Sequence, residues 1–218
     1  MKTKNVILVL IVLIFNSCIV RSLHPFYTEK TIISDTHFLG EWKDKSNAIW
    51  KFSSLGKEIL EGKPLDSLKK DNLKAYNKYK HAFIVERTKK NTKMFFLAVP
   101  FKINKQLFLD FSPLEYENDI ENRELLDLHF VPVHSLVKYD VFTNGNIRFK
   151  WLDEDKITAL FEKKKIKIKH EKTGTLKQTY LLTAKPEELQ KFIKKYMASN
   201  DAEKWDTSTK FTLTKIDE

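Results

Sequence analysis

Residues 136–152 have the sequence L-V-K-Y-D-V-F-T-N-G-N-I-R-F-K-W-L, and this stretch decides the fold class. Two runs rich in aromatic and β-branched residues, 136–143 and 147–152, flank the pair Asn144-Gly145. Runs of this composition favour strands. An Asn-Gly pair between two such runs is the strongest short-range signal for a tight hairpin turn, because both residues adopt positive φ readily. The stretch therefore predicts an antiparallel β-hairpin.

Further short runs of the same kind lie on both sides of this hairpin. They are 48–52, 82–88, 94–103, 106–111, 166–170, 180–183 and 211–216. Asn104-Lys105 separates two of them and predicts a second hairpin. Together the runs predict a mainly β chain, folded as an antiparallel barrel or sandwich of about 8–10 short strands. A barrel is the form we expect, because its interior would take up many of the 27 aromatic side chains (16 Phe, 7 Tyr and 4 Trp).

Two or three peripheral helices are expected between the strands. Asp153 can cap a helix over residues 154–163. Another helix is entered through Pro186, a favoured first-turn residue. It carries apolar residues at i, i+3, i+4 and i+7, namely Leu189, Phe192, Ile193 and Tyr196. This stripe predicts a core-packing face, with a partner-docking face as the alternative. Two more stretches that can hold a helix are 55–79, across Leu65, Leu68 and Leu73, and the acidic 116–128.

Length and composition are those of one ordinary globular domain. Of 218 residues, 42% are apolar and 31% charged, which is too apolar for a disordered chain and too polar for a polytopic membrane protein. The single cysteine excludes an intrachain disulfide framework and any multi-cysteine metal site.

The formal net charge of +10 invites a nucleic-acid interpretation, which the residue types disfavour. Only four of the 39 basic residues are Arg, and Arg dominates specific base readout. We therefore expect no nucleic-acid partner. A solvated lysine-rich surface is the default interpretation, and contact with anionic lipid headgroups is the alternative.

The amino terminus has the layout of a secretory signal. Lys2 and Lys4 precede an uninterrupted apolar run over residues 6–15. Ten residues are too few to span a hydrocarbon core of about 30 Å, which needs about 20 residues in a helix. A positive start followed by a short apolar run is typical of a signal peptide. The alternative that follows from these features alone is an ordinary signal with a leftover thiol at Cys18.

The end of that run, Phe15-Asn16-Ser17-Cys18, resembles the lipobox of bacterial lipoprotein precursors. The resemblance implies that Cys18 is lipidated after cleavage and attaches the protein to a membrane. Residues 1–17 would be the signal peptide, 18–24 a lipidated tether and 25–218 a single β-barrel-like domain. Two or more acyl chains bind a membrane firmly, whereas one binds reversibly.

The residue after the cysteine bears on the location. It is Ile19 and not Asp, and no acidic run follows. By resemblance to lipoprotein sorting signals, this favours an anchor in the outer membrane of the cell envelope, with the protein facing the periplasm.

Two further resemblances concern the domain itself. Gly40-Glu41-Trp42 is similar to the G-x-W motif that opens lipocalin-like barrels, which implies that Trp42 packs across the barrel floor. The chain also resembles a family of uncharacterised bacterial lipoproteins. The stretches that carry this likeness are 22–30, 39–42, 106–113, 134–135 and 182–192. It implies a shared fold and location and supplies no activity.

Residue patterns that carry catalytic or metal chemistry are weak. The six histidines are His24, His37, His81, His129, His134 and His170. The spacing of His129 and His134 fits no standard zinc pattern, so structural histidines are expected. Ser135, His134 and Asp140 are triad-type residues, but adjacent strand residues face opposite ways and no G-x-S-x-G motif is present. Asp153-Glu154-Asp155 lacks the spacing of a calcium loop and fits a helix start. We expect no catalytic residue, no metal and no cofactor.

The segment His24-Pro25-Phe26-Tyr27 is expected to run across the barrel surface or to plug one end, because Pro cannot easily be accommodated in a central strand. Structural closure is the main interpretation of this segment, and a recognition surface is the alternative.

The function expected from all of this is a membrane-anchored, non-catalytic binding or structural module of the cell envelope. Its most concrete form binds a small apolar ligand in the mouth of the barrel. Two alternatives stay open: an assembly partner in an envelope protein complex, and an enzyme, with a hydrolase as the form considered.

Overall fold

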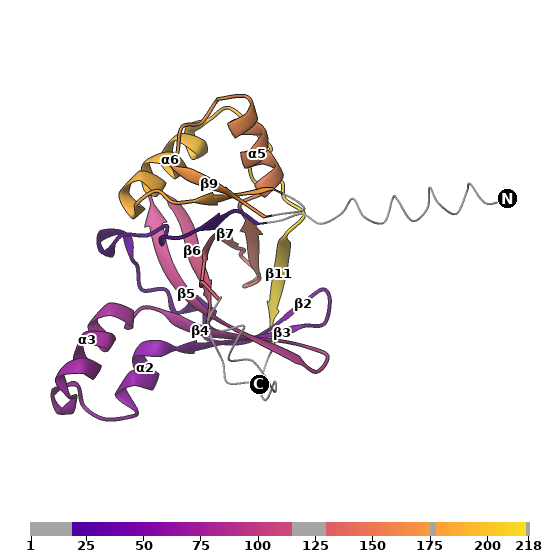
Figure 1. Ribbon diagram of the computed structural model, residues 1–218. Helices are drawn as coiled ribbons and strands as arrows, with labels where there is room; N and C mark the ends of the chain where they lie inside the picture. The colour runs from indigo at the N-terminus through magenta and orange to yellow at the C-terminus, as the bar shows by residue number, and fades with distance from the viewer. Residues whose placement is uncertain (1–18, 115–129, 175–177, 217–218) are drawn as a thin grey trace.

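The hairpin around Asn144-Gly145 is present in the computed structural model, which describes residues 19–114, 130–174 and 178–216 (Figure 1). Strand β7 (His134–Val141) pairs antiparallel with β8 (Ile147–Trp151), and Val141 lies opposite Ile147. Gly145 has φ of 81°, a left-handed conformation that glycine adopts without strain. The predicted hairpin is therefore present, but Gly145 and not Asn144 takes the positive φ, and hydrogen bonds between Phe142 and both Gly145 and Asn146 close the turn.

Eight strands, each antiparallel to its neighbours, close into a barrel. In order around the barrel they are β2 (Gly40–Asp44), β3 (Ile49–Ser54), β4 (Phe83–Lys89), β5 (Thr92–Ile103), β6 (Gln106–Pro113), β7, β8 and β11 (Lys210–Lys215). The first seven follow chain order, and β11 closes the barrel by pairing with both β8 and β2. The predicted fold class, an antiparallel β-barrel with a few peripheral helices, is confirmed.

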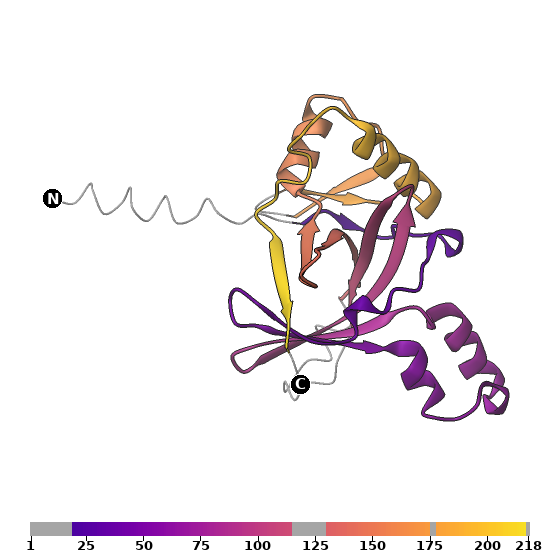
Figure 2. The same ribbon diagram turned by 180° about the vertical axis from the view of Figure 1, so that it is seen from behind.

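An inserted unit separates β8 from β11 and lies over one end of the barrel (Figure 2). It contains α5 (Glu154–Glu162), β9 (His170–Thr173), β10 (Thr179–Leu182) and α6 (Pro186–Ala198). The short strand β1 (Arg21–Ser22) attaches this unit to the barrel, because β1 pairs with β10 on one side and with β7 on the other. The two predicted helices, capped by Asp153 and entered through Pro186, are both present.

The interior of the barrel is filled with aromatic rings. Phe38 is fully buried, and its ring centroid lies 4.8 Å from that of Tyr139 and 5.5 Å from that of Phe52. Trp50 and Trp151 both pack against the ring of Phe211. The buried members of this interior cluster are Phe38, Trp42, Trp50, Phe52, Phe83, Val85, Ala98, Leu109, Phe111, Val137, Tyr139, Ile147, Phe149, Trp151 and Leu213. A small apolar ligand in the barrel would have to displace these side chains.

A second apolar core, which we call the outer core, lies between the outward-facing side of the barrel strands and the inserted unit. Successive strand residues face opposite sides of a sheet, so Leu109 and Phe111 point inward while Phe108 points outward. Phe108 joins a cluster that includes Phe161 of α5 and Phe192 of α6. The apolar stripe of α6, predicted as a core-packing face, is buried along its length. The insertion is therefore fastened to the barrel by apolar burial.

A helical hairpin projects from the opposite side, between β3 and β4 (Figure 1). It contains α2 (Leu55–Leu60), the 3₁₀ helix η3 (Leu65–Ser67) and α3 (Lys70–Tyr79). The helix predicted across Leu65, Leu68 and Leu73 is not continuous, because Leu65 lies in η3, Leu68 is extended and Leu73 lies in α3. Gly62 and Pro64 interrupt the helical pattern between α2 and α3, because glycine weakens a helix and proline lacks the amide hydrogen. The acidic stretch predicted at 116–128 lies outside the described residues.

The residues expected to form a tether at 18–24 are, from Ile19 onward, part of the fold. Ile19 forms a β-bridge with Asp153, and Val20 is buried and donates its N–H to the Leu152 carbonyl at 3.1 Å. Only the apolar character of Ile19 and Val20 could have indicated this, because the pairing partner lies more than 100 residues away in the chain.

One predicted strand is misplaced. Residues 166–170 alternate apolar and basic side chains, but β9 begins only at His170. Ile168 is buried and Ile166 is partly buried against the outer core, so the alternation reports one-sided burial. Burial on one side does not require a neighbouring strand. The alternation of residues 166–169 therefore fits an irregular segment as well as a strand, and the strand prediction is wrong for these residues.

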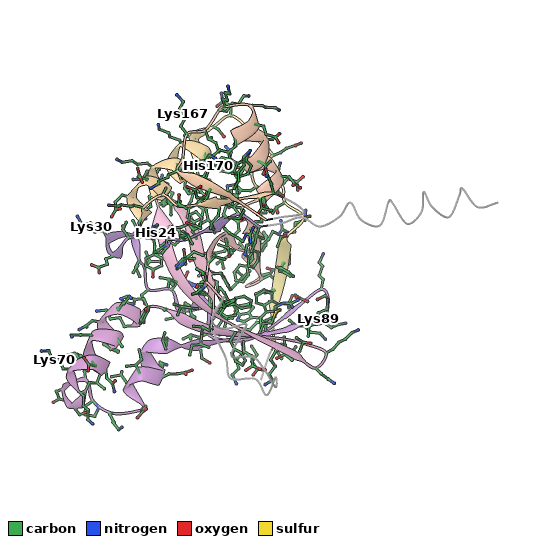
Figure 3. All side chains as sticks on the ribbon, viewed as in Figure 1. His24, Lys30, Lys70, Lys89, Lys167 and His170 are labelled. Atoms are coloured by element: carbon green, nitrogen blue, oxygen red, sulfur yellow. The ribbon has the colours of Figure 1, made fainter. Side chains whose placement is uncertain are left out.

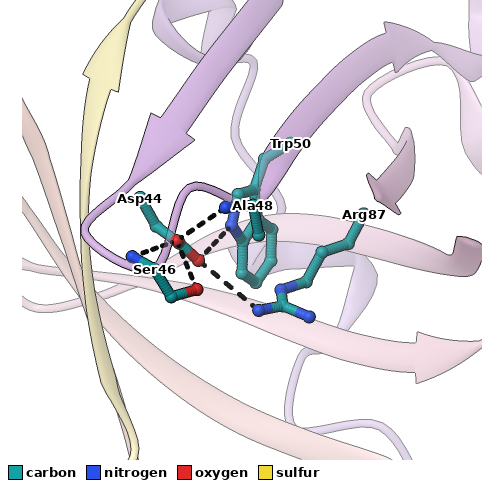
Figure 4. A network of polar contacts seen from close by, with 5 residues as sticks. All are labelled: Asp44, Ser46, Ala48, Trp50 and Arg87. Atoms are coloured by element: carbon teal, nitrogen blue, oxygen red, sulfur yellow. Dashed lines mark hydrogen bonds and ion pairs between the residues drawn. The ribbon is translucent and has the colours of Figure 1, made fainter. Parts of the chain in front are cut away.

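A buried carboxylate organises the β2–β3 turn (Figure 4). Oδ1 of Asp44 accepts hydrogen bonds from Ser46 and from the Ala48 N–H, while Oδ2 accepts one from Trp50 Nε1 at 3.0 Å. Arg87 approaches Oδ2 at 3.5 Å and lies over the Trp50 ring. Burial acts to raise the pKa of Asp44, but the hydrogen bonds outweigh it and hold the pKa below its usual value.

We predict that Asp44→Asn lowers the free energy of unfolding by about 3 kcal/mol, because it removes a buried charge that Trp50 and Arg87 need as an acceptor. Since the folded-state pKa of Asp44 is depressed, its stabilisation is present above the unfolded-state pKa and is lost as pH falls through the folded-state value. Chemical denaturation from neutral to acid pH should therefore show a smaller acid-side loss in the variant. Glu41→Gln, a half-exposed carboxylate on the same strand, is the control and should change stability by less than about 1 kcal/mol. Equal effects of the two substitutions would contradict the role given to Asp44.

Candidate functional site

A lysine-lined groove opens in the inserted unit, between α5, the segment 163–169 and α6. Its volume is about 1010 Å³. We call it the lysine groove. It is lined by Lys156, Ala159, Leu160, Lys163, Lys164, Lys165, Ile166, Lys167, Ile168, Lys169, Glu188, Lys191, Phe192, Lys195, Tyr196, Ser199, Asp201 and Glu203. Lys167 projects from this end of the molecule in Figure 3.

The end of α5 explains why so many lysines point outward. Lys163 donates its N–H to the Ala159 carbonyl, and Lys165 donates to the Leu160 carbonyl at 2.9 Å. Lys164 takes a left-handed φ of 53° and donates to the Phe161 carbonyl. These bonds satisfy carbonyls at the helix end and reverse the chain direction. The backbone N–H groups of the three lysines make the hydrogen bonds of this turn, and their side chains are exposed.

The floor of the lysine groove is apolar. Ile168, Phe192 and Tyr196 are all less than 10% exposed and belong to the outer core. Leu160 and Ile166 are partly buried and pack against the same cluster. Burial raises the pKa of Tyr196, with Asp201 and Asp153 adding to the effect, and its hydroxyl donates to the Lys204 carbonyl at 2.6 Å. The groove therefore combines a structural floor with a charged rim.

The rim carries uncompensated positive charge. Eight lysines line the groove against three carboxylates, Glu188, Asp201 and Glu203. Lys156 donates to a backbone carbonyl, that of Glu203, at 2.6 Å. Among the described residues, no carboxylate oxygen lies within 4.0 Å of the other seven ammonium groups. A concave site lined by one sign of charge attracts ligands or surfaces of the opposite sign.

A second polar cluster lies on the outer face of the barrel, where the amino-terminal segment crosses it. Oδ2 of the buried Asp110 accepts the N–H of Phe26 at 2.8 Å, and Oδ1 lies 2.6 Å from His134 Nδ1. Phe26 is fully buried in the outer core. These contacts agree with the structural closure predicted for His24-Pro25-Phe26-Tyr27.

The residues singled out as a triad are separated by the fold. Ser135 Oγ accepts a hydrogen bond from Trp151 Nε1 and donates to the Phe111 carbonyl. Asp140 pairs with Lys138 on the strand surface. The carboxylate partner of His134 is Asp110, 24 positions away in the chain, which no local motif could indicate.

The remaining histidines are dispersed in the described part of the chain, and His129 lies outside it. His37 contacts Asp35, and His170 packs against Phe161 with ring centroids 4.0 Å apart. Within residues 19–114, 130–174 and 178–216, no three His, Cys, Asp or Glu side chains are grouped as a metal site requires.

Trp42, the tryptophan of the Gly40-Glu41-Trp42 stretch, is a buried residue of the barrel. It lies in β2, the first strand of the barrel, is buried and donates Nε1–H to the Phe38 carbonyl at 2.7 Å. Lys215 of the last strand lies over its ring at 5.9 Å. Gly40 has φ of 109°, a conformation that L residues rarely adopt, and the Lys215 stem passes beside it. Trp42 is therefore a structural residue at the closure of the barrel.

The predicted lipid-attachment residue, Cys18, lies outside the described residues. None of the helices in the described ranges is both long enough and apolar enough to cross a bilayer.

Comparisons of the chain with protein-family models, with curated proteins and with solved structures found no match.

The rim and the floor of the lysine groove should differ in their contribution to stability. Replacing Lys163, Lys165 and Lys167 together by Gln should leave the midpoint of thermal unfolding unchanged or slightly higher, because the three exposed side chains repel one another and have no acidic partner within the part of the chain that the structure describes. Phe192→Ala should lower the free energy of unfolding by about 3 kcal/mol, because it leaves a cavity in the outer core. A large loss of stability in the triple Gln variant would show that the lysines are structural.

The contacts of Asp110 with Phe26 and His134 should stabilise the packing of the amino-terminal segment on the barrel. Asp110→Ala should cost about 3 kcal/mol of unfolding free energy, because the Phe26 N–H and His134 both lose a buried partner. Asp110→Asn keeps an acceptor for Phe26 and should cost less. Urea denaturation measures both variants, and equal losses would contradict the assignment of the Phe26 hydrogen bond.

Proposed function

We propose that this protein is a lipid-anchored, non-catalytic binding module of the cell envelope, whose barrel is a rigid scaffold and whose binding site is the lysine groove. The observation that carries the proposal is the uncompensated charge of the groove rim above an apolar floor. Clustered like charges repel one another and lower stability, and a concave site lined by one sign of charge attracts ligands or surfaces of the opposite sign.

The packing of the barrel supports a site outside it. The sequence suggested a small apolar ligand in the barrel mouth. The interior positions are instead taken by rings such as Phe38, Trp50 and Phe149, which contact one another. An apolar ligand would need to replace these contacts, whereas the lysine groove is open.

The anchor is proposed from the amino-terminal sequence. Cys18 follows a short apolar run and is the only cysteine of the chain. Its proposed lipid would be held in the outer membrane, with the domain facing the periplasm. Lipidation needs a thiol that emerges beside the membrane, and Ile19, the next residue, is half-buried against the interior cluster and bridged to Asp153, the residue that caps α5.

Cys18→Ala should abolish incorporation of labelled fatty acid and make any remaining membrane association reversible, so that high salt releases the protein into the soluble fraction, because two or more acyl chains account for firm attachment. Ser17→Gly, which keeps a small residue before the cysteine, is the control and should be labelled like the parent. Unchanged labelling and fractionation of the Cys18→Ala protein would refute the anchor.

A protein partner is a second candidate, favoured by the α2–α3 hairpin. No residue of α3 is buried, and Leu65 between the two helices is 46% exposed. At the base of the hairpin, a Cβ on Gly56 would lie 2.8 Å from the Lys80 backbone, so the helices pack closely there. Crosslinking in intact cells from a photoreactive residue at position 65 tests this candidate, and recovery of no neighbouring protein counts against it.

A further inference from the structure

The described part of the folded domain begins at Ile19, the residue that follows Cys18. Ile19 is bridged to Asp153, the residue that caps α5, and Val20 is buried beside Leu152. A lipid on Cys18, one residue earlier, would therefore hold the surface around Asp153 directly at the bilayer. This step rests on the anchor proposed above.

Basic side chains flank that point. Lys150 and Lys156 lie three residues on either side of Asp153, so their Cα atoms are within about 11 Å of it along the chain. Lys156 lines the lysine groove. Lys150 lines a neighbouring hollow of about 830 Å³, together with Arg148 and Lys210. Both hollows include Glu203, so they are adjacent on the surface.

The exposed lysines beyond α5 lie within reach of the same surface. The helix has nine residues and is about 14 Å long, so Lys163 at its end lies about that distance from Asp153, and residues 164–169 follow from there. Lysines near an anionic leaflet bind it, and each contributes about a five-fold gain in affinity. Their aliphatic stems and the half-buried Leu160 and Ile166 suit the boundary between headgroups and acyl chains.

We infer that the lysine groove docks on the anionic headgroup surface of the bilayer that carries the lipid anchor, so that the domain lies against the membrane in one orientation. The occupant is the phosphate-bearing face of the bilayer and not a soluble anion. The charge of the rim, the apolar side chains beside it and the start of the described domain at Ile19 all fit this partner.

Vesicle flotation of the chain that begins at Ile19 tests the inference. This chain contains every barrel strand and both apolar cores, and it lacks Cys18, so docking is measured apart from anchoring. It should float with vesicles that contain about one third phosphatidylglycerol and not with neutral phosphatidylcholine vesicles, and the binding should weaken as salt is raised.

Two variants of equal charge locate the surface. Lys163, Lys165 and Lys167 are replaced together by Glu in the first, and Lys57, Lys69 and Lys70 of the α2–α3 hairpin in the second. Lys70 and Lys167 lie at opposite ends of the molecule (Figure 3). The groove variant, which reverses the three charges, should lose more than about 100-fold in vesicle affinity and the hairpin variant less than about three-fold. Circular dichroism and thermal unfolding confirm that both fold, and the Gln variant of the groove lysines gives an intermediate loss.

Each contrary result overturns the inference. Equal losses in the two variants would mean that net charge alone drives binding. No flotation of the parent chain would mean that the groove does not dock, and the fatty-acid labelling of the full chain still decides the anchor separately. Competition by millimolar glycerol phosphate would assign the groove to a soluble anion. Self-association that the groove variant abolishes would assign it to a second copy.

Discussion

The pairing of β11 with both β2 and β8 is the constraint on which the rest of the structure depends. Leu213 lies opposite Asp44 on one side and Ile147 on the other, so the last strand supplies backbone hydrogen bonds to the two strands that would otherwise be edges. Closure removes exposed strand edges and shields the interior from water. Closure also brings the two ends of the inserted unit together, where the Trp151 N–H donates a hydrogen bond to the Thr209 carbonyl at 3.0 Å. The position of α5 and α6 outside the barrel follows from that return.

The filled interior separates stability from recognition in this molecule. Phe38, Phe149 and Tyr139 make the barrel rigid by ring contacts, and the buried Asp44 satisfies the polar groups of the β2–β3 turn at its rim. The outer core then fastens the inserted unit, so the lysine groove has a fixed floor. Its rim contributes positive charge with no described acidic partner. The groove lysines do not stabilise the fold through ion pairs with described residues, so their ammonium groups can bind a negatively charged partner. This is the physical basis of the proposed binding site.

The parts of the fold that the sequence predicted are those set by neighbouring residues. Asn144-Gly145 makes a turn because of its own backbone preferences, and Asp153 caps α5 through an oxygen that reaches Lys156 N–H. The stripe of α6 was predicted because helical spacing places Leu189 and Phe192 on one side. Residues 166–169 were assigned to a strand incorrectly, because one-sided burial gives the same alternation without any pairing. The pairing of Asp110 with His134 and the Phe26 N–H could not be predicted, because it joins three segments far apart in the chain.

By itself, the sequence determined the antiparallel β class, the hairpins, the helix starts and the residue type of the groove rim, all of which depend on local backbone and charge properties. It also carries the proposal of a lipid on Cys18, which is a matter of motif and not of fold. Only the tertiary structure decided that the barrel is filled, that Ile19 and Val20 pack into the folded domain, and that lysines from α5, α6 and the segment between them line one groove. Such arrangements depend on which distant segments pack together, and that choice follows from closure of the whole barrel.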